Sequence, residues 1–521
     1  MIQVSGRPGD GDFSLVDRGA GSGRLMVDTM VCAKEFLTAQ KMYTLSYLAE
    51  TQLQVKHEEI EASSIPLSYK TTPTLLELIK ANENDAFLQL RLMFKLVMLP
   101  LSKQLTCLCG NMWSRSLRAA RAERVEFLLL HDFHGSKFII PEKYTNKERK
   151  EKEQQREEEE KRKLGNDPTK LKALRASKNK PQYAGGLVLE PKRGFYDKYV
   201  LLLDFNSLYP SIIQEFNVCF TTVHHWSVKQ GEMAAVPPAG SVNGHLPKVI
   251  KRLVQRRRNV KDMLKKESNP AKRTELDIRQ KALKLVANSM YGCLGFVSSR
   301  FCQSNRASND RVLGPCVVLL QGSLLILCVL CSLCVRVDCE PLAALITSQG
   351  REILQSSVEL TNSLGANVIY GDTDSIMVYS NETDLRKCMD LGKKIKMEIN
   401  KRHKILEIDI DGVFKNMLLL RKKKYAALKI VEQPDGKFVS QREVKGLDLV
   451  RRDWCPLSKE IGFKVLNEIL SGAPREEVVE KIHGQNERRG KQRQRCNCSV
   501  RNGCSCVVVC RSRLCLFVQP I

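Results

Sequence analysis

Two short acidic strings, each set among apolar residues, constrain the fold of this chain more than any other feature of its sequence. In LLLDFNSLYPSII, Asp204 stands at the end of an apolar run; in VIYGDTDSIMV, Asp372 and Asp374 stand between two such runs. The apolar runs predict β-strands. A carboxylate at the end of a buried strand is costly unless a cation or hydrogen bonds compensate its charge. Two such strands side by side are suited to hold a pair of metal ions for an in-line phosphoryl displacement.

The second string has a simpler interpretation. Gly, Asp, Thr and Ser between alternating apolar runs are good turn residues, so YGDTDS is also typical of an ordinary hairpin. The whole string is far more specific than a lone pair of aspartates with one residue between them, and this favours a site.

With these strings in view, the chain resembles the family B DNA polymerases. DFNSLYPSII is similar to their motif A, KALKLVANSMYG to motif B, YGDTDS to motif C and KKKY to their primer-contacting motif, and the four occur in the expected order. GGLVLEP, LEIDIDGVFK and KGLDLVRRDW make the alpha-class catalytic subunits the most similar members. The resemblance covers residues 23 to 482, with one long interruption.

This resemblance implies an α/β fold of the mixed α+β kind, shaped like a right hand. The palm is a mixed sheet with helices behind it, two helices form the fingers, and a truncated thumb follows. We expect these parts along the chain: an unstructured start (1–22), the C-terminal part of an inactive exonuclease-like domain (23–140), a charged linker (141–182), palm with motif A (183–245), fingers (246–301), an atypical apolar Cys-rich insert (302–339), palm with motif C and KKKY (340–450), the start of the thumb (451–483) and an atypical basic Cys-rich tail (484–521).

Local patterns within these parts predict secondary structure. Residues 23 to 140 alternate helical and strand patterns, and TLLELIKANENDAFLQLRLMFKLV (74–97) predicts a pair of amphipathic helices. The segment 141–182 is almost wholly charged and polar, which predicts a solvated helix or a disordered linker.

By resemblance, the metal site is formed by motifs A and C. Asp204 and Asp374 would bind two Mg²⁺ ions with help from the backbone carbonyl of Phe205. Asp372 would be a supporting carboxylate, because on a strand hairpin it and Asp374 do not both point inward in the same way.

Two predicted helices carry cations on one face each. Arg257 and Lys261 are four residues apart, with Lys265 a further four along, and Lys284 and Asn288 have the same spacing. A basic helix face is most often simply solvated. Beside an acidic pair, two such faces are instead suited to clamp a triphosphate. The resemblance assigns Lys284 and Arg257 to the β- and γ-phosphates, with Lys261 and Asn288 assisting.

The resemblance also assigns the sugar contact. The backbone amides of Ser207 and Leu208, at the start of a helix, would bind phosphate oxygens. Tyr209 would stack under the deoxyribose and exclude a 2′-hydroxyl. Core packing is the alternative for this tyrosine.

The expected DNA contacts follow from motif B and KKKY. Tyr291 would lie at the nascent base pair, and Gly292 would allow close approach of the template. Lys422, Lys423 and Tyr425 would hold the primer duplex independently of its sequence. A net charge of +26 agrees with a polyanionic partner, since phosphate contacts supply most non-specific affinity for nucleic acid.

Proofreading is not expected. In proofreading relatives an acidic residue follows a tyrosine by four positions in this region; Asp85 is present, but Ala81 stands where that tyrosine would be.

Two segments look foreign to the family. Six of the 19 cysteines lie between Cys302 and Cys339, and six more lie between Cys496 and Cys515. Retained intron sequence or wrongly assigned exon sequence accounts for both. The charge-free run Val312 to Val335 is long enough to cross a bilayer, but a span there would separate motif B from motif C. The CNC and CSC pairs of the tail lack the C-x₂₋₄-C spacing of structural zinc sites.

The chain is therefore expected to be a DNA-directed DNA polymerase acting in replication initiation. Its expected partners are primer-template DNA or RNA-primed DNA and deoxyribonucleoside triphosphates. Primase and an accessory B subunit follow by resemblance, although the C-terminal region expected to bind them is absent; no membrane is expected. No secretory signal is evident, and we expect a nuclear protein. The alternative is a catalytically impaired, truncated or mis-spliced product that only binds nucleic acid or partners.

Overall fold

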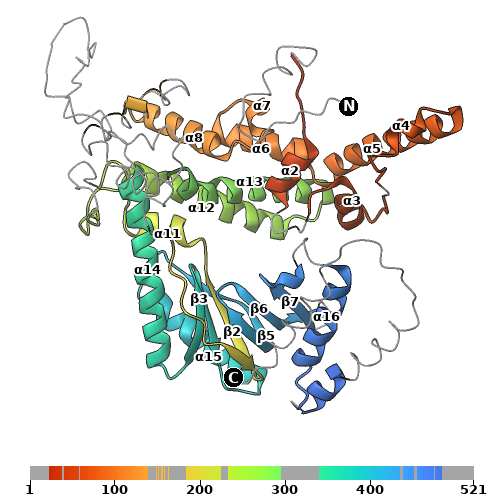
Figure 1. The fold of residues 1–521 in the computed structure, drawn as a ribbon. Helices are drawn as coiled ribbons and strands as arrows, with labels where there is room; N and C mark the ends of the chain where they lie inside the picture. The colour runs from red at the N-terminus through yellow and green to blue at the C-terminus, as the bar shows by residue number, and fades with distance from the viewer. Residues whose placement is uncertain are drawn as a thin grey trace, which may run out of the picture. The chain divides into compact units, whose positions relative to one another are not determined.

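The computed structural model describes residues 23–138, 184–223, 233–294, 339–433, 438–450 and 455–483, apart from isolated positions within these ranges, and single residues between 148 and 162. The chain divides into two compact units. The first comprises Met1–Ala184 and Ile212–Ile346, and the second comprises Gly185–Ser211 and Thr347–Ile521. The described part of the first is helical, whereas the second contains a sheet (Figure 1). Two of the three boundaries between them fall within α11 (Leu208–Glu215) and α14 (Cys339–Ser363), and the third falls between Ala184 and Gly185.

The first two helices of the first unit begin at side-chain caps. Asp28 accepts a hydrogen bond from the amide of Val31 at 3.0 Å and starts the first of them, and the hydroxyl of Thr44 caps the next. In chain order the helices are α2 (Thr29–Phe36), α3 (Leu45–Leu48) with its π-helical continuation η1 (Ala49–Leu53), α4 (Ile65–Ser68), α5 (Thr72–Lys95), α6 (Met98–Cys109), α7 (Trp113–Ser116), α8 (Arg121–Gly135), α12 (His245–Lys266) and α13 (Pro270–Leu294).

The predicted pair of helices over residues 74–97 is wrong, because α5 runs through this stretch without a break. Its polar middle, ANEND, contains neither Gly nor Pro, and most of these residues are exposed, where Asn and Asp cost a helix little. The break comes later. Val97 adopts a left-handed conformation with φ 52°, and α6 begins at Met98.

The strand patterns expected between residues 23 and 140 are also wrong: no strand forms within the described part of this range. Short apolar runs such as VEFLLLH fit a buried helix face as well as a strand. Here they are helical because α8 buries Val125, Leu129 and Phe133 on one side, at a spacing of four residues.

The core of the first unit forms around α13, which packs against α6, α8 and α12. Ile278, Ala282, Val286 and Met290 form a buried line at a spacing of four residues. Burying each large apolar side chain contributes about 1.5–3 kcal/mol. A charged residue in this line would therefore disrupt the unit.

The second unit contains a seven-stranded sheet. Its strands are β1 (Gly194–Tyr196), β2 (Val200–Phe205), β3 (Asn367–Asp372), β4 (Ser375–Tyr379), β5 (Ile408–Arg421), β6 (Lys424–Glu432) and β7 (Phe438–Lys445). The order across the sheet is β3-β4-β2-β5-β6-β7, and β1 pairs with β5.

The palm was expected to be a mixed sheet, but every described strand pair is antiparallel. Short connections join β3 to β4, β5 to β6 and β6 to β7, and short connections permit only antiparallel neighbours. β4 and β5 are joined by a long connection through α15 (Leu385–Asn400), yet they are not neighbours. β2 lies between them and runs antiparallel to both.

Two helices of this unit pack against the sheet. α15 contacts β2 and β5, and α16 (Pro456–Leu470), preceded by the 3₁₀ turn η4 (Asp448–Val450), contacts β5 and β6. α15 approaches closely at Gly392, where an added Cβ would lie 2.9 Å from the Ile410 side chain and 3.1 Å from Leu201. The assignment of residues 451–483 to the start of a thumb remains a prediction; the structure shows that α16 shares a core with the sheet.

Among the described residues, no single helix is both long and apolar enough to cross a bilayer; α5 and α6 meet this criterion only together, as a pair bent by 48°. The predictions for residues 1–22, for most of the linker 141–182, for the insert up to residue 338 and for the tail 484–521 lie outside the described residues.

Candidate active site

The three predicted carboxylates meet at one end of the sheet of the second unit. Asp204 is the penultimate residue of β2 and lies opposite Ser375, the first residue of β4. Asp372 ends β3, and Asp374 occupies the two-residue turn between β3 and β4. The amide of Phe205 donates to the carbonyl of Asp374 at 2.8 Å, which ties the two motifs together.

The carboxylate of Asp204 lies in an environment that disfavours its charge. Desolvation by burial, followed by the charges of Asp374 and Asp411, raises its pKa to about 6. The nearby charge of Lys445 and a hydrogen bond from the Phe205 amide oppose this rise. Such a carboxylate is stabilised by a cation, so this end of the sheet is electrostatically prepared to receive one.

Desolvation also raises the pKa of Asp374, with the charge of Asp372 adding to the effect. Asp372 is in turn compensated by Lys423, whose Nζ lies 3.4 Å from its Oδ1. The hydroxyl of Tyr370 donates to Asp372 Oδ2 at 3.5 Å and accepts from the Lys423 amide at 2.9 Å. Asp372 therefore connects motif C to KKKY, which agrees with a supporting role.

Three turns at this end contain residues other than Gly in the left-handed region. Ser207, Thr373 and Lys423 have φ angles of 52°, 56° and 59°. Each such residue costs about 1 kcal/mol or more. One follows motif A, one separates the aspartates of motif C, and one turns the KKKY hairpin; the other six such residues in the described part of the chain lie elsewhere.

The motif A turn leads directly into α11, whose first residues Leu208 and Tyr209 follow Ser207. Tyr209 is half-buried, and its hydroxyl lies close to Gly186, where an added Cβ would be 3.1 Å from it and 2.7 Å from Thr373 Cγ2. The segment containing Gly186 pairs with the edge of the sheet, because the Thr373 amide donates to the Leu187 carbonyl at 2.8 Å. The tyrosine therefore lies beside the turn that carries Asp374.

The KKKY residues divide between surface and core. Lys422 and Lys423 are exposed, and Lys422 pairs with Glu190 at 2.6 Å. Tyr425 is only 4 % exposed and packs in the sheet core, with its hydroxyl donating to Glu443 at 3.0 Å. The lysines can reach a ligand directly; contact between Tyr425 and DNA stays a prediction.

The predicted cations lie on α12 and α13 of the first unit. Arg257 is half-buried, its Nε is buried without a hydrogen-bond partner, and burial lowers its pKa. The charge of Arg257 is the largest cause that lowers the pKa of Lys261, followed by burial and then by the charges of Lys265 and Lys284. Arg257, Lys265 and Lys284 thus raise the positive potential around Lys261, a local charge that attracts anions.

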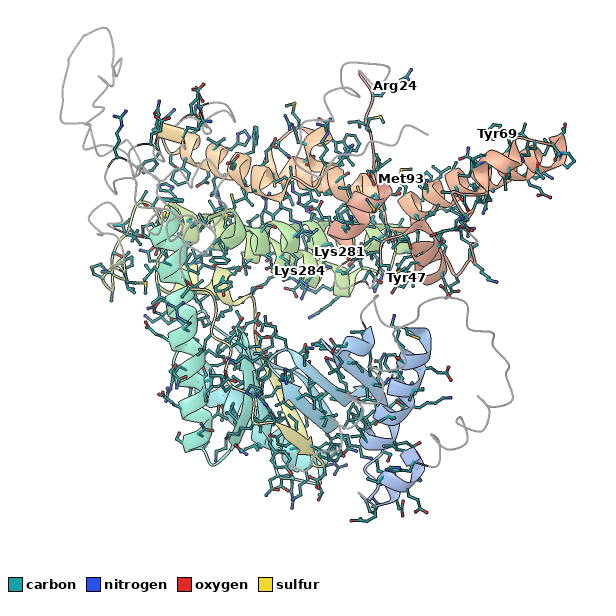
Figure 2. All side chains as sticks on the ribbon, in the orientation of Figure 1. Arg24, Tyr47, Tyr69, Met93, Lys281 and Lys284 are labelled. Carbon is teal, nitrogen blue, oxygen red and sulfur yellow. The ribbon has the colours of Figure 1, made fainter. Side chains whose placement is uncertain are left out.

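The same helices distinguish one lysine from another. Lys281 and Lys284, both labelled in Figure 2, lie on α13. Lys281 pairs with Asp277 on its own helix at 2.7 Å, whereas no described carboxylate lies within 4.0 Å of Lys284. Asn288 is exposed one turn further along, Tyr291 is half-buried, and an added Cβ on Gly292 would meet no atom within 4 Å.

Asp85 has a partner that the sequence did not reveal. Its Oδ1 lies 2.6 Å from Nε2 of His57, and Nδ1 of the same ring lies 2.8 Å from the hydroxyl of Ser46. The residue considered as a remnant of proofreading thus joins α5 to the segment after η1.

Asp409, Asp411 and Lys445 are site residues that the sequence reasoning missed. Asp409 lies opposite Asp204 in the register of β2 and β5, and Asp411 and Lys445 act electrostatically on Asp204. A signal was present for the first two, since LEIDIDGVFK alternates apolar and acidic residues, a pattern typical of a strand. Lys445 had no local signal in the sequence. In the structure, burial lowers its pKa, but hydrogen bonds to Tyr425 and Glu443 outweigh burial and raise it.

No group of three or more His, Cys, Asp or Glu residues in the described part of the chain is arranged to hold a metal ion. Mg²⁺ is commonly bound by one or two carboxylates, with substrate phosphates and water completing its octahedron. Asp204 and Asp374 supply such a pair of hard oxygen ligands with raised pKa values. The residues present therefore fit Mg²⁺ that arrives with a phosphate-bearing ligand, and do not form a fully proteinaceous cage.

Comparison with known proteins shows where this arrangement occurs. The family model described as DNA polymerase family B matches residues 111–309 and 334–501, which is more than half of the chain. The unmatched residues 310–333 lie inside the segment set apart as an insert. The match also includes residues 484–501 of the segment set apart as a tail.

Several curated proteins are similar over most of the chain. DNA polymerase alpha catalytic subunits of Oryza sativa subsp. japonica, Xenopus laevis and Mus musculus are 45 %, 44 % and 42 % identical, over 89 %, 92 % and 92 % of this chain. The chain spans 28 %, 30 % and 30 % of their respective lengths. The alpha-class resemblance expected from GGLVLEP and KGLDLVRRDW is thus confirmed. Because the residues matched by the family model include motifs A, B and C, the chain belongs to DNA polymerase family B.

Proposed function

We propose that this chain is the polymerase core of a template-directed DNA polymerase, which extends a primer with deoxyribonucleoside triphosphates. One observation carries the proposal: in a family B chain, the Phe205 amide next to the motif A carboxylate donates to the backbone carbonyl of Asp374 in motif C, and burial together with the charge of Asp374 raises the pKa of Asp204. Carboxylates whose ionised form is disfavoured in this way are suited to hold metal ions for phosphoryl transfer.

In this proposal Asp204, Asp374 and the carbonyl of Phe205 hold two Mg²⁺ ions. The ions would supply Lewis acidity and charge neutralisation for displacement at the α-phosphate. Asp372 holds Lys423 near the turn through their 3.4 Å ion pair. The left-handed conformation of Thr373 fixes the carboxylate of Asp374 on a two-residue turn, so its position does not depend on a mobile loop.

The cations of α12 and α13 would bind the triphosphate. Arg257 presents a guanidinium with an unsatisfied, buried Nε, and Lys284 is not neutralised by any described carboxylate within 4.0 Å. Binding a phosphate relieves the repulsion among Arg257, Lys261, Lys265 and Lys284, so affinity for the anion is built into the free state. Asn288 would contribute a neutral donor.

The remaining contacts concern sugar and DNA. Tyr209 would exclude a 2′-hydroxyl, and the Ser207 and Leu208 amides would bind phosphate at the start of α11. Tyr291 and Gly292 would face the nascent base pair. The exposed Lys422 and Lys423 would contact the primer duplex through its phosphates, while Tyr425 supports them from the core.

The relatives are named as polymerase alpha catalytic subunits, and by that likeness we propose a nuclear role in replication initiation, with primase and an accessory B subunit as partners. A second candidate is a product that binds nucleic acid without catalysis. It is favoured by the residues 310–333 that fall outside the family match between motifs B and C.

Primer extension by variants of the metal ligands tests the proposal. Asp204→Asn and Asp374→Asn should each lower extension by more than about 100-fold, because transition-state charge loses its stabilisation. DNA affinity should change by less than about twofold, since no phosphate contact is removed. Asp390→Asn is the matched control, because that carboxylate is 72 % exposed and paired with Lys393 outside the site.

Extension at the wild-type rate by either variant would exclude these residues from catalysis. A wild-type chain that binds primer-template but extends no primer would favour the second candidate.

A further inference from the structure

A cavity of about 400 Å³ lies beside the end of β2, within the second unit. Its walls are the end of α15, the loop of residues 401–407, the start of β5, and Asn206, which follows Phe205 in the chain. The Asn206 amide donates to the Glu407 carbonyl at 2.9 Å, so this loop is joined to motif A. No role assigned so far uses the cavity.

The cavity wall is held in place from inside the fold. The side-chain amide of Asn400 donates to the Ile408 carbonyl at 3.1 Å and its oxygen accepts from the Ile408 amide at 2.8 Å, in the manner of a strand pair. Leu406 is buried between these anchors. Both ends of the loop are therefore fixed, and a ligand in the cavity would meet a largely preformed surface.

The loop, KRHKILE, is basic. Three Lys or Arg residues and one Glu in residues 401–407 give a net charge of +2 with neutral histidine. Two carboxylates, Glu407 and Asp409, line the cavity, and Asp409 is paired with Lys396 at 2.7 Å. His403 and Lys404 line the same cavity and supply further nitrogen donors.

We propose that this cavity binds a phosphate group through Lys404, His403 and the side chain of Asn206. Its volume lies in the range of small-molecule sites, and Lys404, His403 and Asn206 place hydrogen-bond donors on its wall beside a fixed loop of net positive charge, which suits an oxyanion. The inference deepens the proposed function and rests on it for the source of the phosphate. That source is either free pyrophosphate, released by nucleotide transfer, or a backbone phosphate of bound DNA.

Lys404→Ala and Arg402→Ala form a matched pair for the test. Each removes one cation from the same loop, but only Lys404 lines the cavity. Lys404→Arg keeps the charge and serves as the rescue variant. The full chain is titrated with inorganic pyrophosphate in EDTA by calorimetry, and separately with fluorescent duplex DNA at several salt concentrations. Circular dichroism establishes that each variant is folded.

The two sources give different results. For free pyrophosphate, Lys404→Ala should weaken binding about tenfold, Lys404→Arg should restore it, and Arg402→Ala should change it less than about twofold. For a backbone phosphate, Lys404→Ala should weaken DNA binding and reduce the salt slope by about 1, with Arg402→Ala close to wild type. Equal behaviour of Lys404→Ala and Arg402→Ala with both probes would overturn the proposal.

Failure here is separable from failure of the proposed function. EDTA removes divalent metal, so pyrophosphate binding in the cavity does not require Asp204 or Asp374. A chain that extends no primer but shows the Lys404 effect would overturn only the polymerase proposal. A chain that extends primers without the Lys404 effect would overturn only the phosphate site.

Discussion

Asp204→Asn should make the second unit more stable while it abolishes catalysis. The wild-type carboxyl has its pKa raised from 3.8 to about 6 by burial and by the charges of Asp374 and Asp411. Ionised Asp204 therefore opposes folding at neutral pH. Asparagine keeps the shape of the side chain and removes the charge. The buried charge is the kind of stability cost that is often found at functional sites.

The magnitude follows from the shift. At 1.36 kcal/mol for each pKa unit, a rise from 3.8 to about 6 corresponds to about 3 kcal/mol at pH 7 and above. Because asparagine must also be desolvated, we expect a gain of about 1–3 kcal/mol, or about 2–12 °C in Tm at about 2–4 °C per kcal/mol for a unit of this size. Below pH 3.8 the carboxyl is neutral in both states and the gain disappears. It should grow as pH rises from 4 to 6 and be complete above pH 7.

Thermal unfolding between pH 4 and pH 8 in EDTA measures this gain, and hydrogen exchange of the β2 amides locates it in the second unit. Asp409→Asn is the control of opposite sign. A hydrogen bond from Lys396 lowers the pKa of Asp409, so its ionised form favours folding above the unfolded pKa and this contribution is lost as pH falls. Asp409→Asn should therefore leave stability unchanged or lower it at pH 7.

Addition of Mg²⁺ with a nucleotide should stabilise the wild type and not Asp204→Asn. If Asp204→Asn is less stable than wild type at pH 7, or if its gain does not depend on pH, the electrostatic account of this site is refuted.

Three further perturbations test other parts of the site. Lys284→Ala should weaken nucleotide binding about tenfold, measured as a Kd by fluorescence titration. Lys281→Ala removes a lysine that is paired on its own helix and should change the Kd less than about twofold. Equal losses would contradict a specific phosphate contact. Tyr209→Ala should raise ribonucleotide incorporation relative to deoxyribonucleotide in primer extension, and an unchanged ratio would make this tyrosine a packing residue. Gly446→Ala should lower the free energy of unfolding of the sheet by about 1–3 kcal/mol and should also lower DNA affinity, because Gly446 has φ 66° and an added Cβ would overlap the Lys423 carbonyl oxygen. A variant with wild-type Tm and DNA affinity would show that the KKKY hairpin adapts.

Features that depend on neighbouring residues could be predicted from the sequence. The apolar run before Asp204 forms β2, and the runs around YGDTDS form the β3–β4 hairpin, because strand pairing across a two-residue turn is a local matter. The cations of α12 and α13 lie on helix faces because helical spacing is also local.

Features that depend on distant partners needed the tertiary structure. Asp411 and Lys445 act on Asp204 only because β5 pairs with β2 and β7 is reached through β6. Tyr425, expected at the DNA surface, is buried, since the register of β6 turns its ring into the sheet core. Asp85 pairs with His57, which is 28 residues away in the chain. The order of the strands results from long-range packing of apolar faces, and this order decides which charges lie near Asp204. No local pattern in the sequence specifies which distant strand will be the neighbour.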